Sequence, residues 1–285
     1  MIAEQGLAQD RLSYVVRRQL LHALEPKWNG SVTLIEDALD QTEPYARRAA
    51  ALKPLMGYVD YVRGDGDEHL LGDDYKEAIN DFTKALAHGE HPVYLGRRAY
   101  AFEEVGELQR AASDLRHAVR LRPSSVADRV HLGDVLRERG QYDEALTVYE
   151  RALTISPSHP GALNGRASVR SAHGQHQQAI RDWEAALDWV GERRRIRYSF
   201  ARTLTFDVGK HAKAAEVLKP VMADAPDWWG YHYTYIMALY RSKDCDVVPA
   251  MERFLDYCQS GECPDENRSY VEELLSRFES RGSCA

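Results

Sequence analysis

The sequence predicts an all-α fold, a right-handed superhelical solenoid of about six helix pairs, and three observations support this prediction. The 285 residues include only 11 prolines, and the stretches between them are rich in strong helix formers. A short motif recurs every 33 to 36 residues, which is typical of repeat proteins. Glycines and prolines accompany the motif at nearly constant offsets, as expected where helices end.

Each copy of the motif is a small residue followed, four positions later, by a large one. The small residues are Ala78, Ala111, Ala145, Ala179, Ala214 and Ala250. The large residues of the first five copies are Phe82, Leu115, Tyr149, Trp183 and Leu218. Helix axes approach to ~8–10 Å only where small side chains leave room. The motif therefore predicts the second helix of a closely packed pair.

A glycine five residues before the small residue is expected to end the first helix of a pair. It is present as Gly106, Gly140, Gly174 and Gly209. Glycine adopts the left-handed conformation that closes a helix at its C-terminus. Ala179 and Ala214 are 35 residues apart, so this interval holds one residue more than the two before it. We expect the extra residue in the turn Asp207-Val208-Gly209, because turns accept insertions at the lowest cost.

The first pair and both ends of the chain depart from the motif. A leading helix is expected over residues 45–63, where Pro54 predicts a kink. Residues 7–24 have the apolar spacing of an amphipathic helix, and Ser31 is a candidate N-cap for a second one. An apolar stripe near the C-terminus consists of Val271, Leu274, Leu275 and Phe278.

These features predict three domains. Because a solenoid needs terminal units with a polar outer face, the end helices are interpreted as caps. We expect an N-terminal helical cap over residues 1–43, a repeat array over 44–260 and a C-terminal capping helix over 261–285.

The small, large and glycine positions together resemble the tetratricopeptide repeat (TPR) family, over the whole of the expected array. The stretch Trp28-Asn-Gly-Ser31 is similar to a W-x-G-S element of uncharacterised bacterial repeat proteins. The TPR resemblance implies a non-catalytic scaffold or adaptor. Such a protein binds a peptide or helix of a partner in a concave groove lined by the first helices.

The resemblance also assigns groove positions within each first helix. The candidate partner-binding residues at these positions are Tyr100, Asp134, Arg137, Asn164, Arg195, Tyr198, Arg202, Phe206, His232 and Tyr235. The groove is expected to be acidic near the second and third pairs and basic and aromatic from Arg195 onwards. Arginine and aromatic residues dominate binding hot spots. We therefore expect a partner of acidic character across the fourth to sixth pairs.

Simpler interpretations compete with this one. The arginine run over residues 193–197 is also typical of a solvated face, or of pairing with Glu184 and Asp188. The aromatic residues near Trp228 are equally consistent with packing of one pair on the next. A dedicated chaperone or immunity-type protein that sequesters one effector is an alternative function, and a metal- or redox-responsive module is a third.

One specialised use of the family's groove is not supported. In chaperone-binding members, lysine, asparagine and arginine side chains on three successive first helices grip a C-terminal carboxylate. In one frame the residues at the matching positions are Val130, Asp134, Gly165, Arg195 and Ser199, and in the frame one repeat earlier they are Gly96, Tyr100, His131, Gly161 and Gly165. Neither frame carries the set, and Asp134 would repel a carboxylate. Recognition of a chaperone tail is therefore not expected.

Composition and motifs limit the other function classes. A formal net charge of −7 argues against nucleic acid as the main partner. No apolar run of 18 or more residues predicts a membrane span, and no signal peptide is evident, so a cytoplasmic location is expected. No catalytic motif or cofactor site is found, and the turn histidines at 88, 91, 173 and 176 are not interpreted as metal ligands. The apolar stripes of the end helices leave self-association open.

The cysteines are confined to the last 41 residues. They are Cys245, Cys258, Cys263 and Cys284. Four cysteines in a chain of this length are too few for a disulfide framework. Ordinary reduced thiols are the favoured interpretation, with a local disulfide and a metal site as the alternatives.

Overall fold

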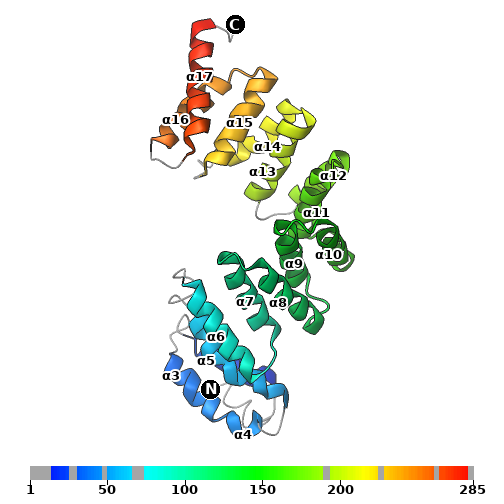
Figure 1. The fold of residues 1–285 in the computed structure, drawn as a ribbon, viewed down its shortest axis with the longest axis vertical. Helices are drawn as coiled ribbons and strands as arrows, with labels where there is room; N and C mark the ends of the chain where they lie inside the picture. The colour runs from blue at the N-terminus through cyan, green and yellow to red at the C-terminus, as the bar shows by residue number, and fades with distance from the viewer. Residues whose placement is uncertain are drawn as a thin grey trace. The chain divides into compact units, whose positions relative to one another are not determined.

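The computed structural model describes residues 14–25, 31–46, 50–65, 74–188, 193–223, 228–259 and 263–281. Every regular element in these ranges is helical, which confirms the all-α prediction (Figure 1). The chain forms two compact units, residues 1–155 and 156–285, and the boundary falls between two helix pairs of the expected array. No described helix is long and apolar enough to cross a membrane.

The first unit starts with short helices and continues with regular pairs. Its early elements are α2 (Tyr14–Ala23), α3 (Val32–Asp40), α4 (Glu43–Ala46), the 3₁₀ helix η2 (Ala50–Gly57) and α5 (Tyr58–Asp65). The later ones are α6 (Tyr75–His88), α7 (Pro92–Glu104), α8 (Leu108–Leu121), α9 (Val126–Glu138) and α10 (Tyr142–Ile155). The early helices share a core of their own, formed around Leu21, Ile35, Leu52 and Leu55.

Two local predictions for this unit can be compared with the structure. Ser31 caps α3, since its side chain accepts a hydrogen bond from the Leu34 N–H at 3.2 Å. Pro54 does not kink a continuous α-helix, because the backbone around it is 3₁₀ over η2 and becomes α-helical only at Tyr58. A proline removes an intrahelical donor, and a tighter 3₁₀ segment accommodates that loss. Residues 1–13 and Trp28 lie outside the described residues.

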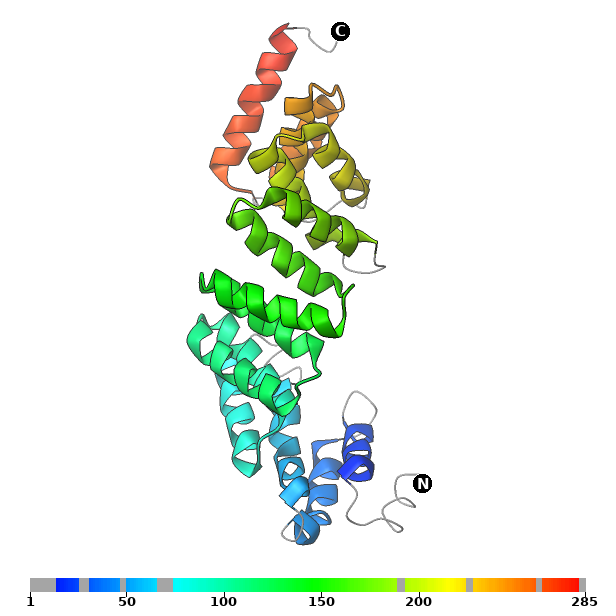
Figure 2. The ribbon, with the colours of Figure 1, turned by 90° about the vertical axis from the view of Figure 1, so that its right-hand side faces the viewer.

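The second unit consists of further pairs and a final helix. Its elements are α11 (Pro160–Ala172), α12 (His176–Leu187), α13 (Arg193–Thr203), the π-helix η3 (Leu204–Val208), α14 (His211–Ala223), α15 (Trp229–Ser242), α16 (Val247–Cys258) and α17 (Asp265–Arg281). Consecutive helices from α11 to α16 lie side by side (Figure 2). The final helix buries Val271 and Leu274, and Phe278 packs edge-on against Tyr240 of α15 at 5.8 Å. The C-terminal stripe therefore faces the protein.

The repeat motif forms the interior of each pair, as predicted. The five alanines from Ala78 to Ala214 have no exposed surface, and the large residues that follow them are at most 1% exposed. The small residues let the two helices approach, and the large ones fill the remaining space. Burial of these side chains is the main stabilising contribution of each pair.

The four glycines end the first helices in the left-handed conformation, with φ between 72° and 77°. In three pairs, the N–H of the residue after the glycine donates to a carbonyl five residues back, as from Gln141 to Leu136. In the remaining pair, formed by α13 and α14, the N–H of Lys210 donates to the Leu204 carbonyl, six residues back. The extra residue therefore lies inside the helix end, as the π-helix η3, and not in the turn where it was expected. A π-turn keeps all of its backbone hydrogen bonds, so the insertion is absorbed without breaking the helix.

Two pairs contain an ion pair between their helices that the sequence did not reveal. Arg98 of α7 donates two hydrogen bonds to Asp114 of α8, at 2.7 and 2.9 Å. Arg166 of α11 donates two to Asp182 of α12, at 2.9 and 2.7 Å. The pairs between and after them have apolar residues at the same positions, Leu132 with Val148 and Phe200 with Val217. Charged and apolar helix pairs therefore alternate along this stretch of the chain.

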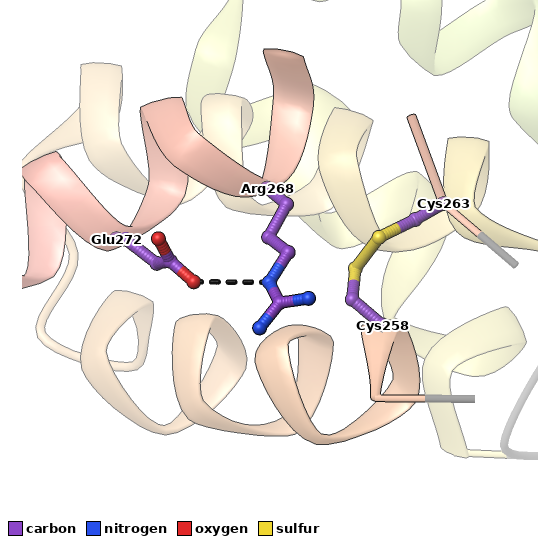
Figure 3. Close-up of a disulfide and its surroundings, with 4 residues drawn as sticks. All are labelled: Cys258, Cys263, Arg268 and Glu272. Carbon is purple, nitrogen blue, oxygen red and sulfur yellow. Dashed lines mark hydrogen bonds and ion pairs between the residues drawn. A yellow bond between two sulfur atoms is a disulfide. The ribbon is translucent and has the colours of Figure 1, made fainter. Parts of the chain in front are cut away.

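A disulfide joins the last two helices. It links Cys258, the last residue of α16, to Cys263, whose Cα lies 5.3 Å away and which precedes α17 by two residues (Figure 3). Cys245 is also disulfide-bonded. The favoured interpretation as reduced thiols is therefore wrong, and a local disulfide, one of the two alternatives, is found. On α17, Arg268 donates to Glu272 at 3.0 Å in an i,i+4 pair that supports the start of the helix.

Candidate partner-binding surface

Two exposed arginine candidates and one exposed aromatic candidate lie on α13 and η3. Arg195, Tyr198, Arg202 and Phe206 are separated by three or four residues, so they share one side of the helix; we call them the α13 face. Arg195 and Arg202 are exposed, and Phe206 retains 41% of its surface. Neither guanidinium forms a hydrogen bond or ion pair with another residue that the structure describes.

An aromatic cluster adjoins the α13 face. The ring of Tyr198 meets Trp228 edge-on at 4.7 Å and Tyr231 at 5.4 Å. The indole of Trp228 lies so close to Gly230 that a Cβ there would collide with it. These rings pack α13 onto the start of α15, as the simpler interpretation supposed. Trp228 nevertheless keeps 38% of its surface exposed, so the cluster also presents an aromatic ring to a partner.

Arg241 of α15 supports the far end of the face. Its guanidinium lies 5.3 Å from the centre of the Phe206 ring, a cation–π contact. It also donates a hydrogen bond to the Thr205 carbonyl at 3.1 Å. Thr205 lies within η3, so Arg241 holds the π-helix and orients Phe206. The sequence motif contains no signal for this contact, because it depends on the inserted residue.

Of the two simpler interpretations of the arginine run, a solvated face fits Arg194 and Arg195, which are exposed. Arg195 forms no ion pair with Glu184 or Asp188, which both lie within the described residues. Glu184 pairs with Lys213 of α14, and Arg197 donates to the Val217 carbonyl at 3.0 Å. One arginine of the run therefore contributes to packing between α13 and α14, while Arg195 remains on the surface.

The first-unit candidates contribute to the structure in different ways. Tyr100 is exposed, with its ring edge-on to Tyr75 at 6.4 Å. Asp134 accepts a hydrogen bond from the Tyr149 hydroxyl at 2.7 Å, and its carboxylate lies 3.7 Å from Arg137. Burial raises the pKa of Tyr149, and the charge and hydrogen bond of Asp134 raise it further. The phenol therefore stays protonated and keeps donating to Asp134.

The three remaining candidates are buried. Asn164 is 8% exposed and accepts a hydrogen bond from the Trp183 indole N–H at 2.9 Å. His232 is 8% exposed and stacks on Tyr257 of α16 at 5.2 Å. Tyr235 is 5% exposed and lies between α14 and α16. The structure therefore places these three side chains among the packed helices and away from the α13 face.

The architecture defines a class of protein, the helical-repeat proteins built from two-helix units. Residues 133–174, which span the end of α9, all of α10 and α11, match the family described as TPR repeat. This match shows a tetratricopeptide repeat over these residues, and the buried motif of each pair supports the resemblance of the other pairs to the same repeat.

Relatives of known sequence match parts of the chain. The small glutamine-rich tetratricopeptide repeat-containing protein 2 of Mycosarcoma maydis is 27% identical over 116 residues, which are 40% of this chain and 33% of that protein. The heat-shock protein cognate co-chaperone sgt12 of Aspergillus fumigatus is 41% identical over 54 residues, 19% of this chain and 16% of that protein. The chain thus spans a third or less of the length of these relatives.

Solved structures share the fold. A tetratricopeptide repeat protein from Parabacteroides merdae superposes with a TM-score of 0.61 at 18% identity, over 91% of this chain and 97% of that one. PilW, a type IV pilus biogenesis factor, superposes with a TM-score of 0.64 at 16% identity, over 75% of this chain and 97% of that one. Identities this low establish the common fold alone.

Proposed function

We propose that the chain is a non-catalytic interaction scaffold that binds an acidic peptide or helix of a partner protein on the α13 face. The repeat family supports the general role of a protein-interaction scaffold, and two of the relatives are named as TPR-containing or co-chaperone proteins. The exposed guanidiniums of Arg195 and Arg202 carry the specific proposal. Arginine recognises carboxylates through two parallel hydrogen bonds, which neither guanidinium makes to any residue in the described ranges.

The surroundings of the two arginines support the same ligand. Trp228 and Phe206 are both exposed and supply apolar surface beside the charged groups, as the aromatic anchors of binding hot spots do. A peptide with alternating carboxylate and apolar side chains would match this sequence of contacts. Tyr100 is the exposed candidate of the first unit and is proposed as a separate contact there.

The experiment that tests this proposal is a binding titration with a fluorescein-labelled peptide of alternating glutamate and leucine residues. The full chain is compared with the double variant Arg195→Glu, Arg202→Glu. We expect about a 100-fold loss of affinity, because each buried charge pair at an interface contributes on the order of 1–2 kcal/mol. Raising the salt concentration is expected to weaken wild-type binding in the same direction.

The matched control is Arg181→Glu with Lys210→Glu, which changes the charge equally at two exposed positions off the α13 face. Its affinity is expected to stay within twofold of the wild type. Thermal unfolding of both double variants verifies that they are folded. Equal affinities of the two double variants for the peptide would refute the proposed surface.

We infer an oxidising compartment for the chain, in place of the cytoplasmic location that the sequence predicts. Cys245, Cys258 and Cys263 are all disulfide-bonded, and disulfides persist in oxidising environments but are reduced in the cytosol. The test is alkylation of the protein in its source cells after acid trapping without reductant. Peptides with Cys258 and Cys263 should carry no label, and labelled thiols at both positions would exclude the inference.

A further inference from the structure

A cavity of about 280 Å³ lies in the second unit, apart from the α13 face. Its walls come from α14, α15 and the first turns of α16. The cavity therefore lies between α14 and α16, which are the second helices of consecutive pairs. Charged groups at its lining are Lys219, Arg253 and Asp246, and the apolar part includes Met222 and Pro249. None of the proposed contacts on the α13 face belongs to this cavity.

The charges of the lining favour one kind of ligand. Lys219 and Arg253 are exposed, and neither forms a salt bridge with any residue in the described part of the chain. Arg253 donates one hydrogen bond, from Nε to the Pro249 carbonyl at 3.2 Å, which leaves its terminal nitrogens available. Among the lining side chains, two cations and the carboxylate of Asp246 leave one positive charge in excess. A ligand with one negative charge would balance it, whereas a dianion would leave the site with a net negative charge.

Tyr235 adds a hydroxyl donor to the same cavity. Only 5% of its surface is exposed, and it lines the cavity. Its hydroxyl forms no hydrogen bond with another described residue. Burial raises the pKa of this phenol, with Asp246 and Asp244 acting in the same direction. The hydroxyl is therefore protonated and able to donate to a ligand in the cavity.

From these groups we propose that the cavity binds a monocarboxylate on a short apolar stem, about the size of one amino acid. Lys219 and Arg253 contact the carboxylate, the Tyr235 hydroxyl donates to it, and Met222 and Pro249 contact the stem. The cavity is at the small end of ligand pockets, which run from ~300 to 1,000 Å³. A single residue fits within such a volume. The ligand source is either a free organic acid or the end of a peptide chain.

The test is saturation-transfer NMR on the full chain with N-acetyl-leucine as the probe. N-acetyl-leucinamide has the same stem without the charge, and inorganic phosphate is added as a competing anion. We expect a signal from the leucine methyl groups of the acid, at least a fivefold weaker one from the amide, and no competition by equimolar phosphate. An equal signal from the amide, or displacement by phosphate, would overturn the proposal.

Variants assign the signal to this cavity. Lys219→Gln with Arg253→Gln should reduce it at least fivefold, and Tyr235→Phe about threefold, since the phenylalanine ring keeps the packing and loses the donor. The control Arg181→Gln with Lys210→Gln should leave it unchanged, as should the α13-face variant Arg195→Glu, Arg202→Glu. A full signal in the Lys219/Arg253 variant would overturn the proposal, whatever the outcome at the α13 face.

The source of the ligand is resolved with the tripeptide acetyl-Ala-Ala-Leu. Competition with N-acetyl-leucine at equal or lower concentration identifies a chain end as the ligand, whereas failure to compete identifies a free acid. Both results are consistent with the carboxylate chemistry of the cavity. Competition by the tripeptide amide would contradict that chemistry.

Discussion

The first helices α9 and α13 have polar side chains at equivalent positions of the repeat, yet these side chains are used differently. On α9, Asp134 accepts a hydrogen bond from Tyr149 of α10 and lies 3.7 Å from Arg137. On α13, Arg202 occupies the position equivalent to Asp134 and is exposed. A polar residue on a first helix is therefore available to a partner only when the second helix does not bind it.

The cause of the difference lies in one pair of positions. Tyr149 is long enough to reach Asp134, whereas Leu218, its equivalent on α14, has no polar group. The Tyr149 ring in turn needs Gly133 beneath it, because a Cβ there would lie 2.5 Å from ring atom Cε1. The equivalent of Gly133 on α13 is Ala201. The combination of Gly133 with Tyr149 and that of Ala201 with Leu218 therefore both fill the space between the two helices of a pair.

The largest expected effect is that of Gly133→Ala, which forces a methyl group into the Tyr149 ring. Because the ring is fully buried, it cannot move aside, and overpacking of this kind costs about 2–3 kcal/mol. Chemical denaturation measures the loss of unfolding free energy. The second change Tyr149→Leu should restore most of the loss, since it recreates the combination found on α13 and α14.

The matched control for that substitution is Gly96→Ala on α7. A Cβ at Gly96 meets no atom within 4 Å, and the residue has ordinary helical geometry. Alanine there should increase stability by about 0.5–1 kcal/mol, because it lowers the entropy of the unfolded chain. If the two substitutions had the same effect, the close approach of Gly133 and Tyr149 would not be the cause.

Loss of the C-terminal disulfide is expected to have the next largest effect. Cys258→Ser with Cys263→Ser removes a short loop constraint that contributes on the order of 2 kcal/mol. Thermal unfolding should show the loss. Affinity for the acidic peptide should remain within twofold, since neither cysteine belongs to the α13 face. A large loss of affinity in the folded variant would mean that the α13 face depends on the C-terminal cap.

Tyr149→Phe is a smaller change that separates the hydrogen bond from the packing. It keeps the ring and removes the donor to Asp134, with an expected cost of about 1 kcal/mol. Asp134→Asn should cost less in the Tyr149→Phe background than in the wild type, because the two groups interact. A double-mutant cycle from denaturation measures the coupling, and additive effects would show that the hydrogen bond contributes nothing.

The smallest expected effect comes from placing the glycine and tyrosine of α9 and α10 at the equivalent positions of α13 and α14. The double change Ala201→Gly, Leu218→Tyr places a phenol where it can accept a hydrogen bond from Arg202. Affinity for the acidic peptide should fall about threefold, since one of the two arginines is then partly occupied, equivalent to ~0.7 kcal/mol. The control Leu218→Phe with Ala201→Gly lacks the hydroxyl and should bind as tightly as the wild type.

Much of the fold follows from the sequence by itself. The alanine and large-residue motif predicted the interior of five pairs, and the glycines predicted where four first helices end. Both depend on local properties, namely the size of a side chain and the conformational freedom of glycine. The place of the inserted residue was predicted less well, because turns and helix ends differ little in sequence.

The candidate surface was only partly predictable. The TPR resemblance assigned Arg195, Tyr198, Arg202 and Phe206 to groove positions, and their spacing is that of one side of a helix. Such spacing could not tell that Asn164 would be bound by Trp183, or that Tyr235 would open into a cavity. Those outcomes depend on residues some 15 to 20 positions away or on the next helix pair, so periodicity within a single helix contains no information on them.

The sequence alone determined that this chain folds as a row of helix pairs and which positions of each pair face the interior. The reason is that burial of alanine and large apolar residues dominates the free energy of each pair. Only the tertiary structure decided which polar side chains remain available. Asp134 and Arg202 occupy equivalent positions, and one side chain on the following helix determines whether each is hydrogen-bonded to that helix or left exposed.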